Sequence, residues 1–320
     1  MRDCYVAGII NHGSYDDVER CLASLRAQTC APRAVYVVDT GVSPGRFAAL
    51  RDAHPDVIFE TRENRGWGAG VNRILARIDA EQATADFALL LNPDIELDPD
   101  FARVLVAAMG AAPDVALASG KLLRPGCVEI DSAGIVLPRH RRPRDRASGQ
   151  PDCHQFDRTE RIFGVSGAAM FVRRAALPDL TLAGEVVDED FFAYHDDTDL
   201  CWRAGLLGWS VLYEPRATAV HARGWRAERR LSIDPQVRRN SFRNHYLQLI
   251  KNERGVDLLR NLPWLLGWEV LRLGFVLLRD RAMLPAYLDA IRKAPRAFAK
   301  RRAIAHRLRE RSELAASRGN

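Results

Sequence analysis

Short apolar runs alternate with helix-like segments through the first 120 residues, and this alternation restricts the possible folds more than any other feature. The runs have the aliphatic and β-branched character of buried strands and lie at 5–11, 34–40, 57–62, 87–93 and 115–120. Helical spacing of apolar residues fills the gaps between them, near 14–28, 45–54, 67–81 and 98–111. This order is typical of βαβ units with helices on both faces of a sheet. The sequence therefore predicts an α/β fold with a doubly wound, largely parallel sheet.

Polar side chains lie at the carboxyl ends of several of the expected strands. They are Asn11, Asp39, residues 62–64, Asn92 and Asp94. Ligands of open α/β sheets bind beyond the carboxyl ends of the strands, so we expect these residues to surround a site. Asp94 can supply the carboxylate that a divalent cation needs when phosphate oxygens complete its shell. The tripeptide Asn-Pro-Asp is also a common turn, and that interpretation stays open.

The stretch RENRGWGAGVN places Gly66, Gly68 and Gly70 between an expected strand and an expected helix. Glycines let backbone N–H groups approach a diphosphate, and a helix N-terminus adds favourable potential. Val71 occupies the last glycine position of the G-x-G-x-x-G pattern, and the loop follows the third strand. Both facts disfavour a dinucleotide-dependent oxidoreductase.

Three aspartates lie within four positions in FFAYHDDTDLCWRAGLLGWS. A helix start accounts for part of this cluster, and Asp199 is expected to pair with Arg203 on the exposed side of that helix. One N-cap cannot use two carboxylates, so Asp196 and Asp197 remain candidates for acid–base chemistry. His195, directly before them, is a weaker competitor for the role of base.

The net charge of +6 is unevenly distributed. Residues 251–320 hold 16 Lys and Arg against 7 Asp and Glu, a net of +9, which leaves −3 on residues 1–250. The segment 261–280 is apolar but interrupted by Glu269 and Arg272, and its apolar core is shorter than the span of about 20 residues that a membrane requires. We expect this segment to form a helix that lies in a membrane interface or packs on a partner. The cationic stretch that follows is expected to act as a peripheral membrane anchor. The alternative is that these helices only cap the core. Nucleic-acid binding is disfavoured because residues 1–250 are net acidic and the tail lacks interleaved aromatic residues.

Two further features bear on location and on access to the site. The cysteines show no metal-ligand or disulfide spacing and the N-terminus reads as a strand, so a cytoplasmic protein is expected.

The basic stretch RHRRPRDR at 139–146 lies in a loop-like region, which is either a solvated loop or a lid over a site.

Six motifs together resemble the family 2 glycosyltransferases of GT-A fold, and most closely their rhamnosyltransferase-like branch. They are YVAGIINHGSYDDVERCLASLRAQ, YVVDT, ENRGWGAGVN, LLLNPDIEL, GVSGAAMFVRR and FFAYHDDTDLCWRAGLLGWSVLYEPRATAVHARG. The resemblance covers roughly residues 5–225 and implies a GT-A catalytic domain at 1–240, a Rossmann-like sheet, and a helical extension at 241–320.

The resemblance also implies roles for individual residues. Asp197 corresponds to the catalytic base and Asp196 to its acidic neighbour. Asp94 corresponds to the metal contact, and His221 to a position that in some relatives helps to hold the metal or diphosphate. The nucleotide-sugar site is implied at Asn11, Asp39, Arg62, Asn64, Gly66, Asn92 and Asp94. Thr40, Arg73 and His195 depart from the family pattern, and Asp196 stands where Glu is usual.

The implied reaction is inverting sugar transfer with Mg²⁺ or Mn²⁺. The expected donor is dTDP-L-rhamnose, and the expected acceptor is a lipid-linked or polysaccharide glycan at the cytoplasmic face of the membrane. A UDP- or GDP-sugar donor is the first alternative, and a non-catalytic membrane-binding protein is the second. A nucleotidyltransferase would leave Asp196 and Asp197 without a function.

Overall fold

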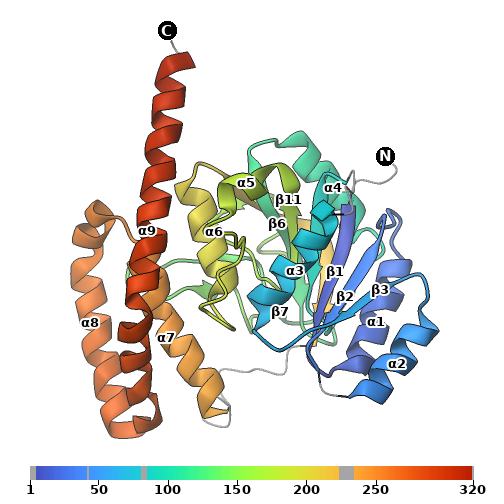
Figure 1. Cartoon of the computed structure of the whole chain (residues 1–320), viewed down its shortest axis with the longest axis horizontal. Helices are drawn as coiled ribbons and strands as arrows, with labels where there is room; N and C mark the ends of the chain where they lie inside the picture. The colour runs from blue at the N-terminus through green and yellow to red at the C-terminus, as the bar shows by residue number, and fades with distance from the viewer. Residues whose placement is uncertain (1–4, 42, 81–84, 223–233, 319–320) are drawn as a thin grey trace.

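The computed structural model describes residues 5–41, 43–80, 85–222 and 234–318, and shows a mixed sheet between helices with a helical extension beside it (Figure 1). The strands are β1 (Tyr5–Asn11), β2 (Val35–Asp39), β3 (Ile58–Thr61), β4 (Phe87–Leu91), β5 (Ile95–Leu97), β6 (Val115–Leu123), β7 (Ile130–Ser132), β8 (Ile135–Val136), β9 (Arg144–Asp145), β10 (Glu160–Ile162), β11 (Ala169–Arg173) and β12 (Ser210–His221). The α-helices are α1 (Tyr15–Arg26), α2 (Pro44–Ala53), α3 (Trp67–Ala80), α4 (Phe101–Ala111), α5 (Leu177–Leu180), α6 (Asp196–Leu206), α7 (Pro235–Asn252), α8 (Gly255–Arg279) and α9 (Leu284–Arg318). The predicted strands and helices of the first 120 residues are confirmed with ends shifted by a few positions.

The main sheet has the order β10-β12-β6-β11-β4-β1-β2-β3, with β5 and β7 paired at its side. Strands β3, β2, β1 and β4 are parallel, as predicted. β11 lies antiparallel between β4 and β6, so the second half of the sheet is mixed. The parallel half brings the ends of β1 and β2 to one edge, where Asn11 is in register with Asp39.

Alternate side chains of each central strand enter two separate cores. Tyr5, Ala7 and Ile9 of β1 face one core, which α1, α2 and α4 cover. Val6 and Ile10 face the other, which α3, α5 and α6 cover. This two-sided burial explains why the strands read as continuous apolar runs rather than as alternating patterns.

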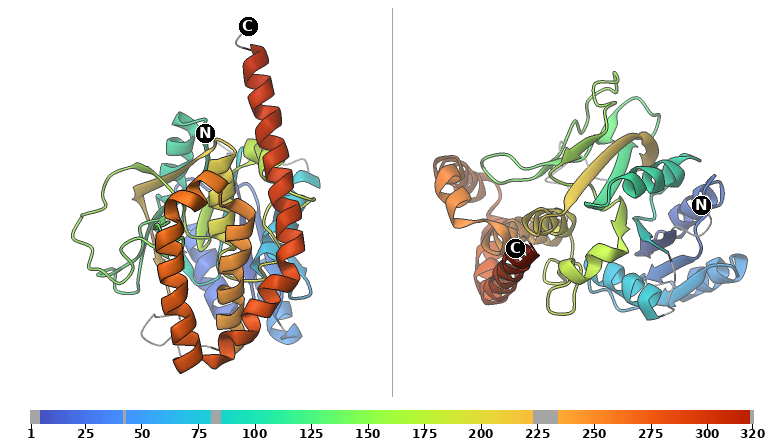
Figure 2. Two further views of the ribbon diagram at one scale, coloured as in Figure 1. Left: turned by 90° about the vertical axis from the view of Figure 1, so that its left-hand side faces the viewer. Right: turned by 90° about the horizontal axis from the view of Figure 1, so that it is seen from above.

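The helices α7, α8 and α9 form a bundle beside the sheet (Figures 1 and 2). Phe242 of α7 and Val276 of α8 share a small core with Met283 and with Ala286 of α9. A second cluster joins Leu247 of α7 and Ala297 of α9 to Phe191, just before α6. The expected boundary after residue 240 thus falls within a continuous helix that packs against both proposed parts of the chain.

Two expectations, one about the apolar segment 261–280 and one about the basic stretch 139–146, need correction. Among the described helices, α8 alone is long and apolar enough to cross a membrane by length and composition, because its 25 residues continue through Glu269 and Arg272. The basic stretch 139–146 is not wholly solvated. His140 stacks on Trp268 of α8 with ring centroids 4.7 Å apart, and the guanidinium of Arg139 lies 4.5 Å from the ring centroid of Trp264.

Candidate active site

The ends of β1 and β2 form one polar corner of the site. The amide of Asn11 donates a hydrogen bond of 2.8 Å to Asp39, and the Tyr15 hydroxyl donates to the other Asp39 oxygen at 3.0 Å. The backbone N–H of Gly41 also donates to Asp39. Asn11 and Asp39 are almost fully buried, so their side chains are held in place before any ligand binds. The structure thus brings together the first two residues of the expected nucleotide site.

The glycine-rich loop after β3 rests on the backbone of Phe192. Gly66 has a φ of +91°, and a Cβ at this position would lie 1.8 Å from the Phe192 carbonyl oxygen. That carbonyl accepts a hydrogen bond from Trp67 N–H, and the Asn64 side chain accepts one from Gly66 N–H. Only glycine allows this close approach. The loop therefore lies against the segment that leads to Asp196. Arg62, in contrast, is half-exposed and forms an ion pair with Glu60.

Asp94 and His221 meet at the edge where β12 passes the turn after β4. His221 Nε2 lies 3.4 Å from an Asp94 carboxylate oxygen, and Nδ1 lies 2.7 Å from Asp131 Oδ2. Burial lowers the pKa of His221, but hydrogen bonds and charge from Asp131 and Asp94 outweigh it and raise the pKa to about 9. Burial also opposes the charge of Asp94, and His221 outweighs it, so the Asp94 pKa lies below its ordinary value.

This pair suits a cation that is shared with a phosphate ligand. A carboxylate and an imidazole nitrogen face one another, and Asp131 on the far ring nitrogen fixes the orientation of His221, as the partners of metal-binding histidines do. Among the described residues no group of three or more His, Cys, Asp or Glu side chains forms a closed metal site. An open pair fits Mg²⁺ or Mn²⁺ bound together with a diphosphate, because such ions use few protein ligands.

Asn92 lies beside this pair and links it to the segment before β11. Its backbone N–H donates to the Ala168 carbonyl at 2.9 Å. The neighbouring Gly167 N–H donates to Asp197 Oδ2 at 3.0 Å. The segment 167–168 therefore connects the Asp94 side of the site with the N-terminus of α6.

Asp196 and Asp197 begin α6 and have different surroundings. Asp197 is half-buried, and its two oxygens accept hydrogen bonds from the backbone N–H groups of Gly167 and Thr198. Asp196 is buried, and its Oδ2 makes no hydrogen bond to a described residue. Burial, and then repulsion from Asp197, raise the pKa of Asp196 to about 8. The two carboxyl groups are thus close enough to be coupled, while their hydrogen bonding differs.

The third aspartate of the cluster is structural, as the sequence indicated, but its partners are not the expected ones. Asp199 and Arg203 are both fully buried, so the expected exposed pair between them is wrong. Asp199 instead accepts hydrogen bonds from Lys251 and Asn252 of α7, and Arg203 donates to the Val186 carbonyl.

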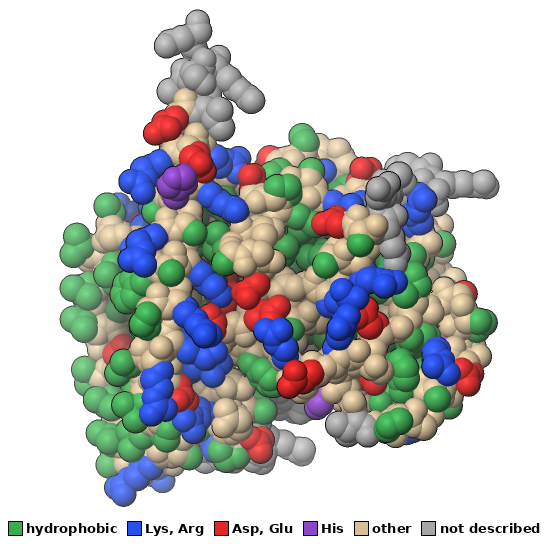
Figure 3. Space-filling view, viewed as in Figure 1, with side chains coloured by type: hydrophobic (Ala, Val, Ile, Leu, Met, Phe, Trp, Pro, Cys, Tyr) green, Lys and Arg blue, Asp and Glu red, His purple; other side chains and the backbone are tan. Residues whose placement is uncertain are grey.

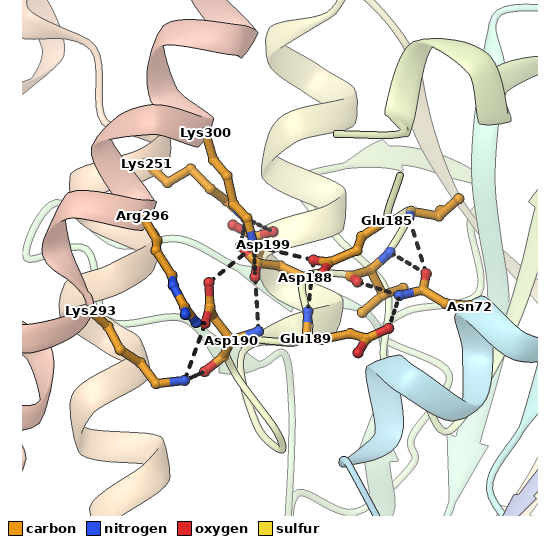
Figure 4. Close-up of polar contacts among 12 residues, drawn as sticks. Asn72, Glu185, Asp188, Glu189, Asp190, Asp199, Lys251, Lys293, Arg296 and Lys300 are labelled. Carbon is orange, nitrogen blue, oxygen red and sulfur yellow. Dashed lines mark hydrogen bonds and ion pairs between the residues drawn. The ribbon is translucent and has the colours of Figure 1, made fainter. Parts of the chain in front are cut away.

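Basic residues of α7 and α9 bind the acidic loop at 185–190 (Figure 4). Lys251 Nζ lies 2.6 Å from Asp188, and Lys300 pairs with the same carboxylate. Burial opposes the charge of Asp188, but the two ammonium groups outweigh it and hold its pKa below the ordinary value. Asp190 pairs with Lys293 and Arg296 as well. Part of the charge of the basic tail is therefore neutralised by the acidic loop at 185–190.

Sequence reasoning missed Asp131, Gly167 and Lys251, which lie far along the chain from the residues that they contact. The end of the last quoted motif, from residue 223, lies outside the described residues. A cavity of about 520 Å³ also lies along the side of α6, between Trp202 and Arg254, and the expected site residues do not line it.

Comparisons with known proteins identify the family and the fold of the chain. Residues 7–178 match the model of glycosyl transferase family 2. Over 248 residues the chain is 29% identical to an N-acetylglucosaminyl-diphospho-decaprenol L-rhamnosyltransferase of Mycobacterium tuberculosis, a match that covers 69% of this chain and 76% of that protein.

Solved structures of sugar transferases share the fold at low identity. A mannosyltransferase from Pyrobaculum calidifontis, PcManGT, in complex with GDP-Man and Mn²⁺, has a TM-score of 0.52 and 17% identity, covering 99% of this chain and 81% of its own. GalNAc-T7 with UDP, GalNAc and Mn²⁺ has a TM-score of 0.55 and 11% identity, covering 77% and 48%. S. aureus TarS has a TM-score of 0.58 and 14% identity, covering 93% and 49%, so the chain spans about half the length of these last two proteins. The chain belongs to glycosyl transferase family 2 and is a nucleotide-sugar glycosyltransferase with the GT-A fold.

Proposed function

We propose that this enzyme transfers L-rhamnose, with inversion, from dTDP-L-rhamnose to a hydroxyl of a lipid-linked or polysaccharide acceptor in bacterial cell-surface glycan synthesis. The observation that supports it most directly is the facing pair of Asp94 and His221, 3.4 Å apart. The pair lies at the same edge of the sheet at which β1 ends with Asn11 and β2 ends with Asp39. Likeness to the mycobacterial rhamnosyltransferase supports the choice of donor.

In this proposal each part of the donor is assigned to particular residues. Asn11 and Asp39 hold the nucleobase, because their buried polar groups offer both a donor and acceptors at the carboxyl ends of β1 and β2. Arg62, Asn64 and Gly66 border the nucleotide, and Asn92 lies next to Asp94. Asp94 and His221 would hold a Mg²⁺ or Mn²⁺ ion, which when bound offsets the charge of the departing diphosphate.

Asp197 is the proposed catalytic base. It takes the proton of the acceptor hydroxyl while that oxygen bonds to the anomeric carbon and the bond from this carbon to the diphosphate oxygen breaks. The bonds from Gly167 and Thr198 N–H hold its carboxylate in one orientation. Asp196, whose pKa burial raises to about 8, positions the acceptor or tunes its neighbour.

The enzyme works at the cytoplasmic face of the membrane in this proposal, and α8 supports that location. Leu259, Val270, Leu271 and Leu278 of this helix are each about 70–80% exposed. In the space-filling view hydrophobic side chains line the edge over α8, beside a column of Lys and Arg side chains along α9 (Figure 3). An exposed apolar face next to cations is typical of helices that bind anionic lipid surfaces.

A donor screen tests the proposal. Thermal stability is followed with dTDP-rhamnose, other dTDP-, UDP- and GDP-sugars, and the bare nucleotides, each with and without Mn²⁺. A ligand that binds only the folded state raises the apparent stability by mass action. We expect metal-dependent stabilisation by dTDP-rhamnose that Asp94→Ala abolishes and Asp197→Ala retains. Stabilisation by UDP- or GDP-sugars alone would reassign the donor, and no stabilisation by any nucleotide sugar would contradict the proposal.

Membrane association is tested on the full-length chain, because removal of α9 would also remove Lys293 and Lys300 from the acidic loop. The double substitution Leu259→Gln and Leu278→Gln should weaken binding to vesicles that contain phosphatidylglycerol. Because both side chains are exposed, the fold should be retained, and unchanged vesicle binding would remove α8 from the proposed anchor.

A further inference from the structure

Four parts of the chain meet beside the N-terminus of α6, in a cluster that the proposed donor site does not use. We name it the histidine–arginine cluster, and it consists of His195, His245, Arg142, Arg272 and Ser241. The rings of His195 and His245 have centroids 6.4 Å apart. Ser241 Oγ of α7 lies 3.3 Å from His195 Nε2. Arg272 of α8 and Arg142 of the basic loop lie near enough for their charges to act on both rings.

His245 has a buried polar ring without satisfied hydrogen bonds. Its side chain is 2% exposed, and neither ring nitrogen makes a hydrogen bond to a described residue. The nearest charged group is Glu269, whose Oε1 lies 3.6 Å from Nε2. Buried polar groups are normally hydrogen-bonded, since leaving one unpaired is costly. Glu269 is an ionic partner of His245 but lies beyond hydrogen-bond distance, so a ligand can complete the hydrogen bonding of this buried imidazole.

Aromatic rings support the cations around this cluster. The guanidinium carbon of Arg272 lies 3.7 Å from the ring centroid of Phe242, and that of Arg142 lies 5.7 Å from Trp268. A guanidinium that is stacked by its face keeps its N–H edge clear of the ring, and Arg272 uses this edge to donate to the Phe242 carbonyl and to pair with Glu269. These contacts therefore hold two cations in defined positions.

Burial and the nearby arginines lower the pKa of both histidines. Burial is the main cause that lowers the pKa of His195, to about 3, followed by His245, Arg142 and Arg272. Burial also lowers the pKa of His245, to about 4; Glu269 opposes this shift, and Arg272 and Arg142 add to it. Glu269 is also shared with Tyr246 and Arg272, so it does not balance both arginines.

We propose that the histidine–arginine cluster binds the phosphate or diphosphate group of a membrane-resident lipid acceptor. The apolar face of α8 adjoins this headgroup site, because Arg272 belongs to the same helix as the exposed Leu271 and Leu273. The lipid chain lies in the membrane next to that face, and the sugar to be extended reaches toward Asp197. This assignment rests on the proposed sugar transfer and names the class of its acceptor.

The position of α6 accounts for the separation of donor and acceptor. Asp197 contacts Gly167, which adjoins the residue bonded to Asn92 on the donor side. His195, two positions earlier, contacts Ser241 on the side of α7. The proposed base thus stands between the donor edge of the sheet and the cluster.

Binding of farnesyl diphosphate to the full-length protein tests this assignment, with farnesol, inorganic diphosphate and phosphatidylglycerol vesicles as comparison probes. Arg142→Gln should weaken farnesyl diphosphate binding roughly ten- to hundredfold, the loss expected for one hydrogen bond to a charged group. His195→Asn is the second variant, because Asn tolerates the left-handed backbone that His195 adopts at φ 67°. Arg254→Gln removes an exposed cation at the start of α8 and should leave binding unchanged.

Each remaining outcome separates the possible sources of the anion. Equal binding of inorganic diphosphate would show a site for a soluble phosphate and overturn the lipid assignment. Loss of farnesyl diphosphate binding in Asp94→Ala would place the probe in the donor site and overturn the lipid assignment. If Arg142→Gln weakened vesicle binding as much as it weakened farnesyl diphosphate binding, the cluster would be part of a general membrane surface, which would also overturn the assignment. Nucleotide-sugar stabilisation should persist in Arg142→Gln. Its absence in the unmodified enzyme would instead contradict the proposed sugar transfer.

Discussion

The ammonium of Lys251 lies 2.6 Å from a carboxylate oxygen of Asp199, and both side chains are almost completely buried. Lys251 belongs to α7 and Asp199 to α6, the helix that begins with the proposed catalytic carboxylates. The same ammonium lies 2.6 Å from Asp188. Buried ion pairs therefore join α7 to α6. We infer that the C-terminal helices stabilise the geometry of the site.

Removal of that ammonium should be severely destabilising. Lys251→Ala leaves Asp188 and Asp199 buried with one cation fewer, a change that typically costs about 3–5 kcal/mol. Arg296→Ala is the matched control, because its side chain is 75% exposed although it pairs with Asp190 in the same loop, and it should cost less than about 1 kcal/mol. Urea denaturation measures both variants. Similar losses of stability in the two would contradict the special role of Lys251.

Gly66 should not tolerate a side chain. Its φ of +91° and the predicted contact of 1.8 Å with the Phe192 carbonyl mean that Gly66→Ala must move the loop away from the segment before α6. We expect a loss of at least about 1–3 kcal/mol together with weaker donor binding. Gly45→Ala, in α2 with open space around it, should instead stabilise the protein by up to about 1 kcal/mol. Thermal melting with and without nucleotide sugar distinguishes the two positions. A Gly66→Ala variant with the stability and donor binding of the parent protein would contradict this interpretation.

Local pattern in the sequence was sufficient for part of the fold. The apolar runs at β1 to β4 and the helical spacing of Val71, Ile74 and Ile78 in α3 are properties of neighbouring residues, and both were predicted. The antiparallel insertion of β11 between β4 and β6 depends on pairing across about 80 residues of chain, which periodicity does not encode.

The site shows the same division. Asn11, Asp39 and Asp94 were predicted as site residues because each lies at the end of a strand or in the turn after one. Asp131 and Lys251 act on residues 90 and 52 positions away, and no local pattern sets them apart from other charged residues. For Asp199 the local rule of helix pairs failed, because burial against α7 gave it a better partner than Arg203.

The raised pKa of Asp196 predicts a pH-dependent stability. The unfolded chain loses this proton near pH 4, whereas the folded state keeps it up to about pH 8. The folded state therefore binds more protons in this window, and stability falls as the pH rises through it. Asp196→Asn should be more stable than the parent at about pH 8 and similar at about pH 4. Denaturant midpoints across the range check this, and parallel curves for the two proteins would show that Asp196 is not the source.

Asp131 should tune the proposed metal site without contacting the metal. Its Oδ2 lies 2.7 Å from His221 Nδ1, so Asp131→Asn loosens the orientation of the ring that faces Asp94. The expected result is a 10- to 100-fold higher Mn²⁺ requirement for activity, as is typical when the partner of a metal-binding histidine is changed. Glu129→Gln, a half-exposed carboxylate just before β7, is the control and should leave the Mn²⁺ titration unchanged. An unchanged titration in Asp131→Asn as well would separate His221 from the metal.

Asp197 and Asp196 can be distinguished as base and neighbour by comparing their amide variants. In Asp197→Asn the side chain still accepts one backbone N–H bond but cannot take the hydroxyl proton, so the transfer rate should fall roughly 10²- to 10⁴-fold. Donor-induced thermal stabilisation should remain, because the donor contacts lie on the other side of the 167–168 segment. Asp196→Asn keeps the carboxylate that faces Gly167 and should lose less activity. The reverse order would assign the base to Asp196. Equal, complete loss in both would indicate that the two carboxyl groups accept the hydroxyl proton as one coupled pair.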